Sequence, residues 1–214
     1  MKILITDDHA VVRQGYTALL AAMLPECEII EANSGEQALS LFNEYAPELI
    51  IMDINLPGIS GIETARRIRL KATQARVLFF SMYMETPLVK QALESGSGYI
   101  TKSCSPDVLL EAVNRVMQGH LYVEHELAIK LALNRPEQTD QRLREMTQRE
   151  LEVFVMLARG MSSKQVADSL CISHKTVSNY TANLKSKLRV SSTAELVHLA
   201  IETGIIKLGS MSHS

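Results

Sequence analysis

The chain has 214 residues, of which 46% are apolar and 21% charged, a composition typical of a globular protein with one large domain or two modest ones. No apolar stretch approaches the roughly 20 residues that span a bilayer. The first apolar run starts directly after Lys2, which leaves no room for a secretion signal. We therefore expect a cytoplasmic protein without a membrane partner. The three cysteines, Cys27, Cys104 and Cys171, are widely spaced and form no zinc motif, so we expect buried thiols.

Charge is distributed unevenly along the chain. Residues 1–142 contain 13 basic and 18 acidic side chains, a net charge of −5, whereas residues 143–214 contain 9 basic and 6 acidic side chains, a net charge of +3. An acidic surplus suits a site for metal ions and phosphoryl groups, and a basic surplus in a small domain favours contact with a polyanion. The asymmetry indicates two halves of different chemistry.

The first domain, which we place at residues 1–118, alternates short apolar runs with amphipathic stretches. The runs lie at 3–6, 28–30, 49–52, 77–80 and 99–100, and the stretches between them repeat apolar residues at helical spacing. The last helix has a start signal in Ser105-Pro106-Asp107, a capping hydroxyl followed by proline and an acid. This alternation predicts an α/β fold, a doubly wound, five-stranded parallel sheet with helices on both faces.

Five polar residues fall where these strands end. They are Asp7 and Asp8, then Asp53, Ser81 and Lys102. Because the carboxyl ends of parallel strands open onto one crevice, we expect the five side chains to lie close together. Three clustered carboxylates repel one another unless a divalent cation lies among them, and Mg²⁺ prefers sparse carboxylate sites completed by water and phosphate oxygens. The pattern predicts a Mg²⁺-dependent phosphorylation site, with one carboxylate free to act as the nucleophile.

Residues 119–142 break the alternation and form the predicted interdomain linker. They begin at Gly119 and end in the polar run 134–141, with a short helical piece around 125–133. Leu127, Ile129 and Leu131 of that piece could pack on either neighbouring domain.

The second domain, residues 143–208, carries only helical signals, and we expect an all-α unit of four helices. Capping boxes open the first helix at Thr147 and the second at Ser162, and the last helix starts at Ser192. A tight turn at 171–173 separates the second helix from the third, which predicts a helix-turn-helix motif whose third helix enters a DNA major groove. The residues expected at DNA are Lys175, Thr176, Ser178, Asn179, Ala182 and Lys185.

The last helix carries an apolar stripe of Val197, Ala200 and Ile201. If the other three helices leave it uncovered, the stripe is a candidate dimer seam that would place two recognition helices on neighbouring half-sites. The alternative is that Val197 and Ile201 complete the core of a monomer, as amphipathic terminal helices often do.

Several stretches taken together resemble a known family. They are ILITDDHAVVRQGY, LIIMDINLPGISGIE, the strand that ends at Ser81, GYITKS, and MTQRELEVFVMLARGMSSKQVADSLCISHKTVSNYTANLKSKL. The chain resembles, from Met1 to about Ile206, the two-component response regulators of the NarL/FixJ class, which join a CheY-like receiver domain to a LuxR-type helix-turn-helix domain. Within the class, residues 102–107 and 128–132 are similar to a regulator of sugar-phosphate uptake.

The resemblance implies a role for each residue at the strand ends. Asp53 would accept the phosphoryl group, and Asp7, Asp8 and Asp53 would hold Mg²⁺ together with the backbone carbonyl of Asn55. The serine and lysine of the set would contact phosphoryl oxygens, which agrees with catalysis by positioning and charge neutralisation. Tyr99 matches the switch aromatic of the family, whose ring would turn inward as the serine hydroxyl moves toward the phosphoryl group.

Two positions depart from the family pattern. Met82 stands where the wider family often has a small residue, so access to the phosphoryl group and its lifetime are expected to change. Ser178 stands where many members have lysine, so the base preference of relatives does not transfer to this chain.

The pattern as a whole predicts a transcription regulator. A sensor histidine kinase would phosphorylate Asp53, and phosphorylation would let the output domain bind double-stranded DNA as a homodimer, with RNA polymerase as a further partner. Its only catalysis would be its own phosphorylation. Two alternatives are a Mg²⁺-dependent phosphohydrolase that uses Asp53 on small substrates, and a receiver that binds a protein partner without phosphorylation. The helix-turn-helix argues against the first, and the full acidic set argues against the second.

Overall fold

The structure is a computed structural model that describes residues 1–133, 143 and 145–206. It divides into an α/β unit, formed by most of the first 128 residues, and a helical unit, formed by most of the rest. The polar run predicted at 134–141 lies outside the described residues. Within the described part of the chain, no helix is long and apolar enough to cross a membrane.

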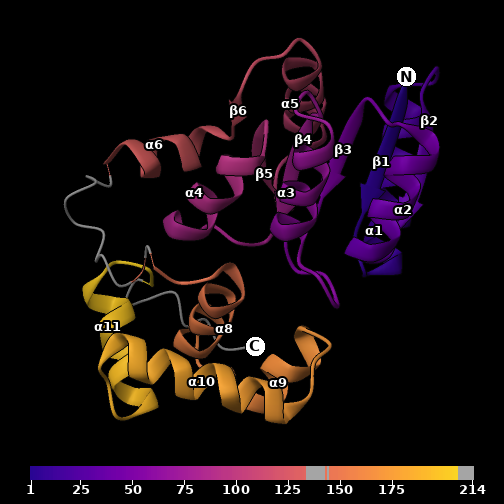
Figure 1. The fold of residues 1–214 in the computed structure, drawn as a ribbon. Coiled ribbons are helices and arrows are strands. Elements are labelled where there is room, and N and C mark those ends of the chain that lie inside the picture. Colours follow the sequence, from indigo (N-terminus) through magenta and orange to yellow (C-terminus); the bar gives the residue numbers. More distant parts are fainter. Residues whose placement is uncertain (134–142, 144, 207–214) are drawn as a thin grey trace. The chain divides into compact units, whose positions relative to one another are not determined.

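The α/β unit is built around a parallel sheet with the strand order β2-β1-β3-β4-β5-β6 (Figure 1). The strands are β1 (Lys2–Thr6), β2 (Glu28–Ala32), β3 (Leu49–Met52), β4 (Val77–Ser81), β5 (Gly98–Thr101) and β6 (Tyr122–Val123). The helices that connect the first five are α1 (Ala10–Met23), α2 (Gly35–Tyr45), α3 (Gly61–Lys71) and α4 (Thr86–Ser95), and α5 (Pro106–Met117) follows β5. The predicted doubly wound fold and its five strands are therefore confirmed.

The sixth strand corrects the predicted number of five. β6 lies parallel to β5, with Gly98 opposite Tyr122 and Tyr99 opposite Val123. A Cβ atom at Gly98 would lie 2.8 Å from the carbonyl oxygen of Tyr122, so the glycine permits this close approach. A strand of two residues is too short to carry an alternating pattern, which is why the sequence did not reveal it. The helical piece predicted next is present as α6 (His125–Leu133).

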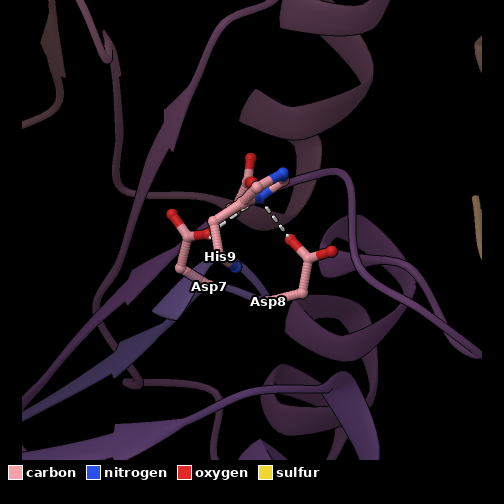
Figure 2. Close-up of side chains that lie close together, drawn as sticks. Asp7, Asp8 and His9 are labelled. Atoms are coloured by element: carbon pink, nitrogen blue, oxygen red, sulfur yellow. Dashed lines mark hydrogen bonds and ion pairs between the residues drawn. The ribbon is translucent and has the colours of Figure 1, made fainter. Parts of the chain in front are cut away.

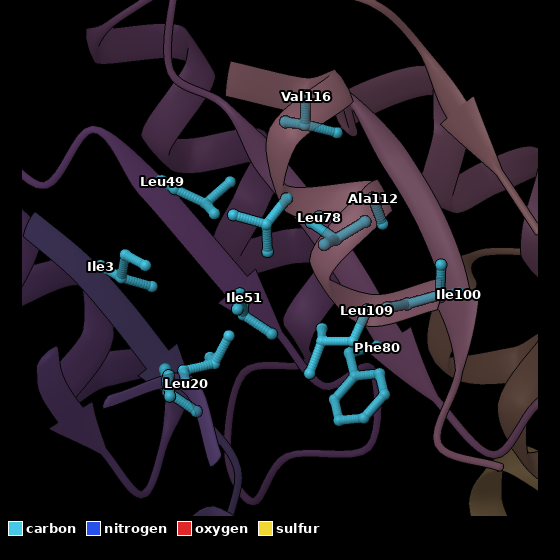
Figure 3. Packing of buried hydrophobic residues seen from close by; sticks show 12 residues of the cluster. Ile3, Leu20, Leu49, Ile51, Leu78, Phe80, Ile100, Leu109, Ala112 and Val116 are labelled. Carbon is cyan, nitrogen blue, oxygen red and sulfur yellow. The ribbon is translucent and has the colours of Figure 1, made fainter. Parts of the chain in front are cut away.

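An apolar core fills the space between the sheet and the helices α1 and α5 (Figure 3). Ile3 and Ile51 face it from the strands, while Leu20 and Leu109 cover it from the two helices. Leu4, which points to the opposite face because side chains alternate along a strand, is also fully buried. Both faces of the central strands β1, β3, β4 and β5 are therefore covered, whereas the edge strands β2 and β6 are partly exposed.

The helical unit contains the four predicted helices, α8 (Gln148–Ala158), α9 (Ser163–Ser169), α10 (His174–Leu188) and α11 (Thr193–Glu202). Both predicted capping boxes are formed: Thr147 pairs with Glu150, and Ser162 pairs with Gln165. Such reciprocal caps satisfy two backbone donors at each helix start, which explains why the sequence located these ends well.

The expectation of buried thiols was wrong for one cysteine, and the other two are only partly buried. Cys27 and Cys104 are half-buried, and Cys171 is exposed. Cys171 lies in the turn between α9 and α10 with a φ of 50°, a left-handed conformation that ends the helix at the surface. Its position in a turn outweighs the apolar character of the residue.

Candidate functional site

A cluster of carboxylates lies at the carboxyl ends of β1 and β3. These strands are neighbours in register, with Thr6 opposite Met52, so the residues that follow them meet at one edge of the sheet. Asp7, Asp8, His9 and Asp53 each offer a ligand atom, and these atoms all lie within 4.8 Å of one another. The side chains of Asp7 and Asp53 are only 4% exposed, so burial makes their mutual repulsion costly.

The backbone that carries Asp53 leaves no room for a side chain at Gly61. The amide of Gly61 donates to the carbonyl oxygen of Ile54 at 2.9 Å. A Cβ atom at Gly61 would lie 1.8 Å from the carbonyl oxygen of Asp53. Gly61 therefore lets the start of α3 pack directly on the backbone that carries the carboxylate.

Lys102 reaches the acidic cluster from the end of β5. Its Nζ atom lies 2.6 Å from Oδ2 of Asp7 and 2.6 Å from Oδ2 of Asp53, and its side chain is 9% exposed. The backbone of Lys102 is held on both sides, because its amide donates to the carbonyl oxygen of Ser81 and its carbonyl oxygen accepts from the hydroxyl of Tyr16. The ammonium group thus joins two carboxylates that come from different strands.

Burial and charge oppose each other at this site. Burial raises the pKa of Asp53 above its ordinary value, the Asp7 carboxylate adds to the rise, and the Lys102 ammonium acts against it. Burial by itself would lower the pKa of Lys102, but the neighbouring carboxylates of Asp53 and Asp7 outweigh it and the pKa is raised. The lysine is consequently charged at neutral pH, and it compensates part of the buried negative charge.

The sequence reasoning missed His9. Its Nδ1 atom lies 2.8 Å from Oδ1 of Asp8 and 3.4 Å from Oδ1 of Asp7 (Figure 2), and its amide donates to Oδ1 of Asp7 at 2.9 Å. The side chain is 61% exposed, so it borders the cluster on the solvent side. The six histidines are dispersed along the chain; direct adjacency to the Asp pair was the signal that could have identified this one.

The donor set fits a hard divalent cation. Three carboxylates converge on one small volume, and oxygen is the ligand that Mg²⁺ takes. The amide of Asn55 donates to Oδ1 of Asp53 at 3.4 Å, which keeps the Asn55 backbone beside the cluster. Repulsion among buried carboxylates that Lys102 only partly compensates is the physical reason for the site to take a cation.

Ser81 and Tyr99 lie on the neighbouring strands β4 and β5. Ser81 is 1% exposed, and among the described residues its hydroxyl oxygen has no well-formed hydrogen-bond partner, although the hydroxyl is near enough to help lower the pKa of Asp53. The Tyr99 ring is fully buried, and its hydroxyl donates to the carbonyl oxygen of Tyr83 at 2.7 Å. The ring therefore already occupies the inward position that the sequence associated with activation. Met82 is 63% exposed at the rim of the site.

The candidate recognition helix is α10. Val177, Leu184 and Leu188 are buried along one stripe. On the remaining surface, the predicted DNA residues Lys175, Ser178, Asn179 and Ala182 are exposed, whereas Thr176 and Lys185 are half-buried. The Thr176 hydroxyl shares a hydrogen bond of 2.8 Å with the capping hydroxyl of Ser173, so Thr176 contributes to the helix start.

The candidate dimer seam on α11 is narrower than predicted. Ala200 is fully buried, while Val197 and Ile201 are half-buried. A seam on this helix would therefore rest on Val197 and Ile201, together with exposed neighbours such as His198.

Comparison with known proteins agrees with this division of the chain. A family model described as "Response regulator receiver domain" matches residues 3–114, and one described as "Bacterial regulatory proteins, luxR family" matches residues 144–200. The chain belongs to the response regulators with a LuxR-type output domain. The α/β unit of this regulator is its receiver domain, and the helical unit is its DNA-binding output domain.

Relatives of the regulator match it over nearly its full length. It is 51% identical to the transcriptional activator protein ExaE of Pseudomonas putida, over 98% of this chain and 100% of ExaE. It is 31% identical to the response regulator GacA of Pseudomonas aeruginosa, over 98% of this chain and 100% of GacA. The similarity to a regulator of sugar-phosphate uptake is minor beside these relatives.

A solved structure has the same fold. RcsB from Salmonella enterica serovar Typhimurium, solved bound to promoter rprA in the presence of a phosphomimetic, aligns with a TM-score of 0.62, 21% identity, and coverage of 92% of this chain and 96% of RcsB. At this identity the likeness extends to the fold alone.

The geometry around Lys102 makes a prediction about stability. Replacing Lys102 with alanine leaves two buried carboxylates uncompensated, so the free energy of unfolding at neutral pH without divalent cations should fall by about 3 kcal/mol. Urea denaturation measures the change. Lys71→Ala, at an exposed position on α3, removes the same charge and should change stability by less than about 0.5 kcal/mol. Equal stability of Lys102→Ala and wild type would show that the ion pairs contribute nothing.

Proposed function

We propose that the regulator accepts a phosphoryl group on Asp53 from a sensor histidine kinase and then binds double-stranded DNA as a homodimer. One arrangement supports this proposal above the others. Asp53 is buried, and its Oδ2 atom lies 2.6 Å from the Lys102 ammonium. One carboxylate oxygen of Asp53 also lies within 4.8 Å of a carboxylate oxygen of Asp7 and of Asp8. A nucleophilic carboxylate, cation-binding oxygens and a fixed positive charge are the parts that phosphoryl transfer requires.

The protein contributes to the transfer mainly by positioning the groups and neutralising their charge. An oxygen of Asp53 attacks the phosphorus of the kinase phosphohistidine, and the O–P bond forms in line as the P–N bond breaks. The imidazole of the kinase keeps the electron pair and takes up a proton. Asp7 and Asp8, with the backbone carbonyl of Asn55, would hold Mg²⁺, which when bound neutralises charge on the phosphoryl oxygens.

Lys102 and Ser81 then respond to the new group. The Lys102 ammonium, which lies 2.6 Å from Asp53, moves its contact from a carboxylate oxygen to a phosphoryl oxygen. The buried hydroxyl of Ser81 can donate to a second phosphoryl oxygen. Movement of Ser81 at the end of β4 reaches Tyr99, because β4 and β5 pair at Phe79 and Tyr99. The surface formed by α4, β5 and α5 would carry the signal away from the site.

Phosphate incorporation tests the nucleophile. Asp53→Asn keeps the shape of the side chain but removes the attacking carboxylate, so labelling by a small acyl phosphate should be abolished, and EDTA should abolish labelling of the wild type. Asp168→Ala, at an exposed position on α9, serves as the control and should label normally. Undiminished labelling of Asp53→Asn would exclude Asp53 as the acceptor. Steady turnover of a small phosphate ester by the wild type would contradict the proposal that the protein catalyses only its own phosphorylation.

The output domain has the features of a DNA reader. The exposed surface of α10 combines Lys175 with the short side chains of Ser178, Asn179 and Ala182, so the helix can approach base edges closely. The relative ExaE is named as a transcriptional activator, which supports RNA polymerase as a partner at a promoter. We expect such a role to be carried out in the cytoplasm.

Two substitutions separate the contacts of α10. Lys175→Ala should weaken binding to all DNA sequences by a similar factor and reduce the salt slope of the affinity by about one unit if the contact is to phosphate. Asn179→Ala should instead reduce discrimination between sequences by about 1–3 kcal/mol. Fluorescence anisotropy at several salt concentrations measures both effects, and Lys71→Ala controls for net charge. Unchanged affinity and discrimination in both variants would exclude this helix surface as the reader.

The half-buried residues of α11 test dimerisation. Val197→Glu places a charge in the proposed seam, so binding to paired half-sites should weaken on the order of tenfold while binding to a single half-site is unchanged. Ala194→Glu puts the same charge at an exposed position in the first turn of this helix and should bind paired sites normally. If a folded Val197→Glu variant occupied paired half-sites with wild-type affinity, Val197 would belong to the monomer core alone.

A further inference from the structure

The segment that follows α5 returns to the sheet and is fastened there. The hydroxyl of Tyr122 on β6 donates to Oε2 of Glu111 on α5 at 3.2 Å. The backbone of β6 approaches β5 at Gly98, where a side chain would collide with the Tyr122 carbonyl. These contacts make β6 part of the receiver domain and bring Glu124, the next residue, to the end of β5.

The hydrogen bonds between β5 and β6 follow a regular order up to the last one. The amides of Tyr122 and Glu124 donate to the carbonyl oxygens of Ser97 and Tyr99, at 3.2 and 3.0 Å. Alternate residues of a strand bond toward the same side, so the next donor on this edge of β5 is the amide of Thr101.

A side chain replaces the backbone acceptor at this last position. The carbonyl oxygen of Glu124 accepts from the amide of Ala128 at 2.9 Å, in the first turn of α6. The Glu124 carboxylate accepts from the Thr101 amide instead, with a distance of 2.7 Å to Oε2. A charged acceptor makes this bond stronger than the neutral one it replaces.

Thr101 directly precedes the lysine of the acidic site. The loop around it has further bonds of its own: Thr101 Oγ1 lies 2.9 Å from the hydroxyl oxygen of Ser103, and the amide of Cys104 donates to the carbonyl oxygen of Thr101. On the opposite edge of β5, the Lys102 amide donates to the Ser81 carbonyl oxygen at 3.0 Å. The Glu124 carboxylate therefore holds from one side a short backbone segment that β4 holds from the other.

We propose that Glu124 is a positioning residue for phosphoryl transfer, which fixes the backbone of Thr101 so that the Lys102 ammonium meets the phosphoryl group at Asp53. The proposal rests on the function proposed above. Without the carboxylate, the Thr101 amide loses its partner and one edge of β5 is released at the residue before Lys102. A displacement of about 1 Å at a catalytic group is enough to cost up to about a hundredfold in rate.

Three variants test the role of this side chain. Glu124→Ala removes the acceptor, Glu124→Gln keeps a carbonyl oxygen that can accept from Thr101, and Glu126→Ala removes an exposed acidic side chain from the same helix start. We expect the maximal rate of labelling by a small acyl phosphate to fall on the order of tenfold in Glu124→Ala. The rate should return to within about twofold of wild type in Glu124→Gln and stay unchanged in Glu126→Ala. The donor concentration for half-maximal rate should change little, because the lysine acts on the transferring group.

Cation binding distinguishes positioning from damage to the fold. A released lysine competes less for Asp7 and Asp53, so Mg²⁺ affinity measured by calorimetry should be unchanged or higher in Glu124→Ala, whereas a disordered site would bind Mg²⁺ more weakly. Hydrogen exchange at the Thr101 amide should accelerate in Glu124→Ala and remain slow in Glu124→Gln.

The outcomes separate this inference from the proposed function. If the wild type itself took up no phosphate, the proposed function would fail. If the wild type were labelled on Asp53 and Glu124→Ala were labelled equally fast, the positioning role would be overturned. Loss in Glu124→Ala accompanied by weaker Mg²⁺ binding, or an equal loss in Glu124→Gln, would also overturn it.

Discussion

The compensation of two buried carboxylates by one lysine is the interaction on which the receiver domain depends. Asp7 and Asp53 are brought together by adjacent parallel strands, and the ammonium of Lys102 lies within 2.6 Å of both. Burial raises the pKa of Asp53, so the carboxylate is a costly charge that a cation relieves. In the proposed function, metal binding and phosphorylation at this site would each alter a charge balance that the solvent screens weakly, so the same poor solvation would let the change be passed on.

The backbone around the site is arranged for close approach. Gly61 allows α3 to start against the carbonyl of Asp53, and Gly98 allows β6 to reach β5. On the lysine side, the Thr101 and Lys102 amides donate to opposite edges of β5, to the Glu124 carboxylate and to the Ser81 carbonyl. The two groups that the proposed transfer uses, the Asp53 carboxylate and the Lys102 ammonium, are thus each attached to a backbone segment held by close contacts. Such preorganisation would be the protein's main contribution to the proposed transfer, which depends on positioning.

In the output domain, helix caps and one exposed helix surface are the main features. Capping groups define where each of its helices starts, with boxes at Thr147 and Ser162 and single caps at Ser173 and Ser192. The buried stripe of α10 leaves Lys175, Ser178, Asn179 and Ala182 exposed on its other surface, which suits the proposed entry of this helix into a groove. The charge asymmetry of the chain agrees with this separation of a phosphorylatable domain from a polyanion-binding domain.

The sequence by itself determined what depends on local pattern. The alternation of apolar runs and amphipathic stretches specified five strands of the sheet, and capping signals specified the starts of the output helices, because both are properties of neighbouring residues. The strand ends also identified Asp7, Asp8, Asp53 and Lys102 as one group, since parallel strands share an edge.

Only the tertiary structure could decide what depends on packing at a distance. The pairing of Glu124 with Thr101, the burial of Ala200, the inward position of Tyr99 and the exposure of Cys171 all involve contacts or turns that carry no periodic signal. The two-residue strand β6 approaches β5 where Gly98 has no side chain, and the Glu124 carboxylate accepts the next hydrogen bond from β5; the sequence alone shows neither contact.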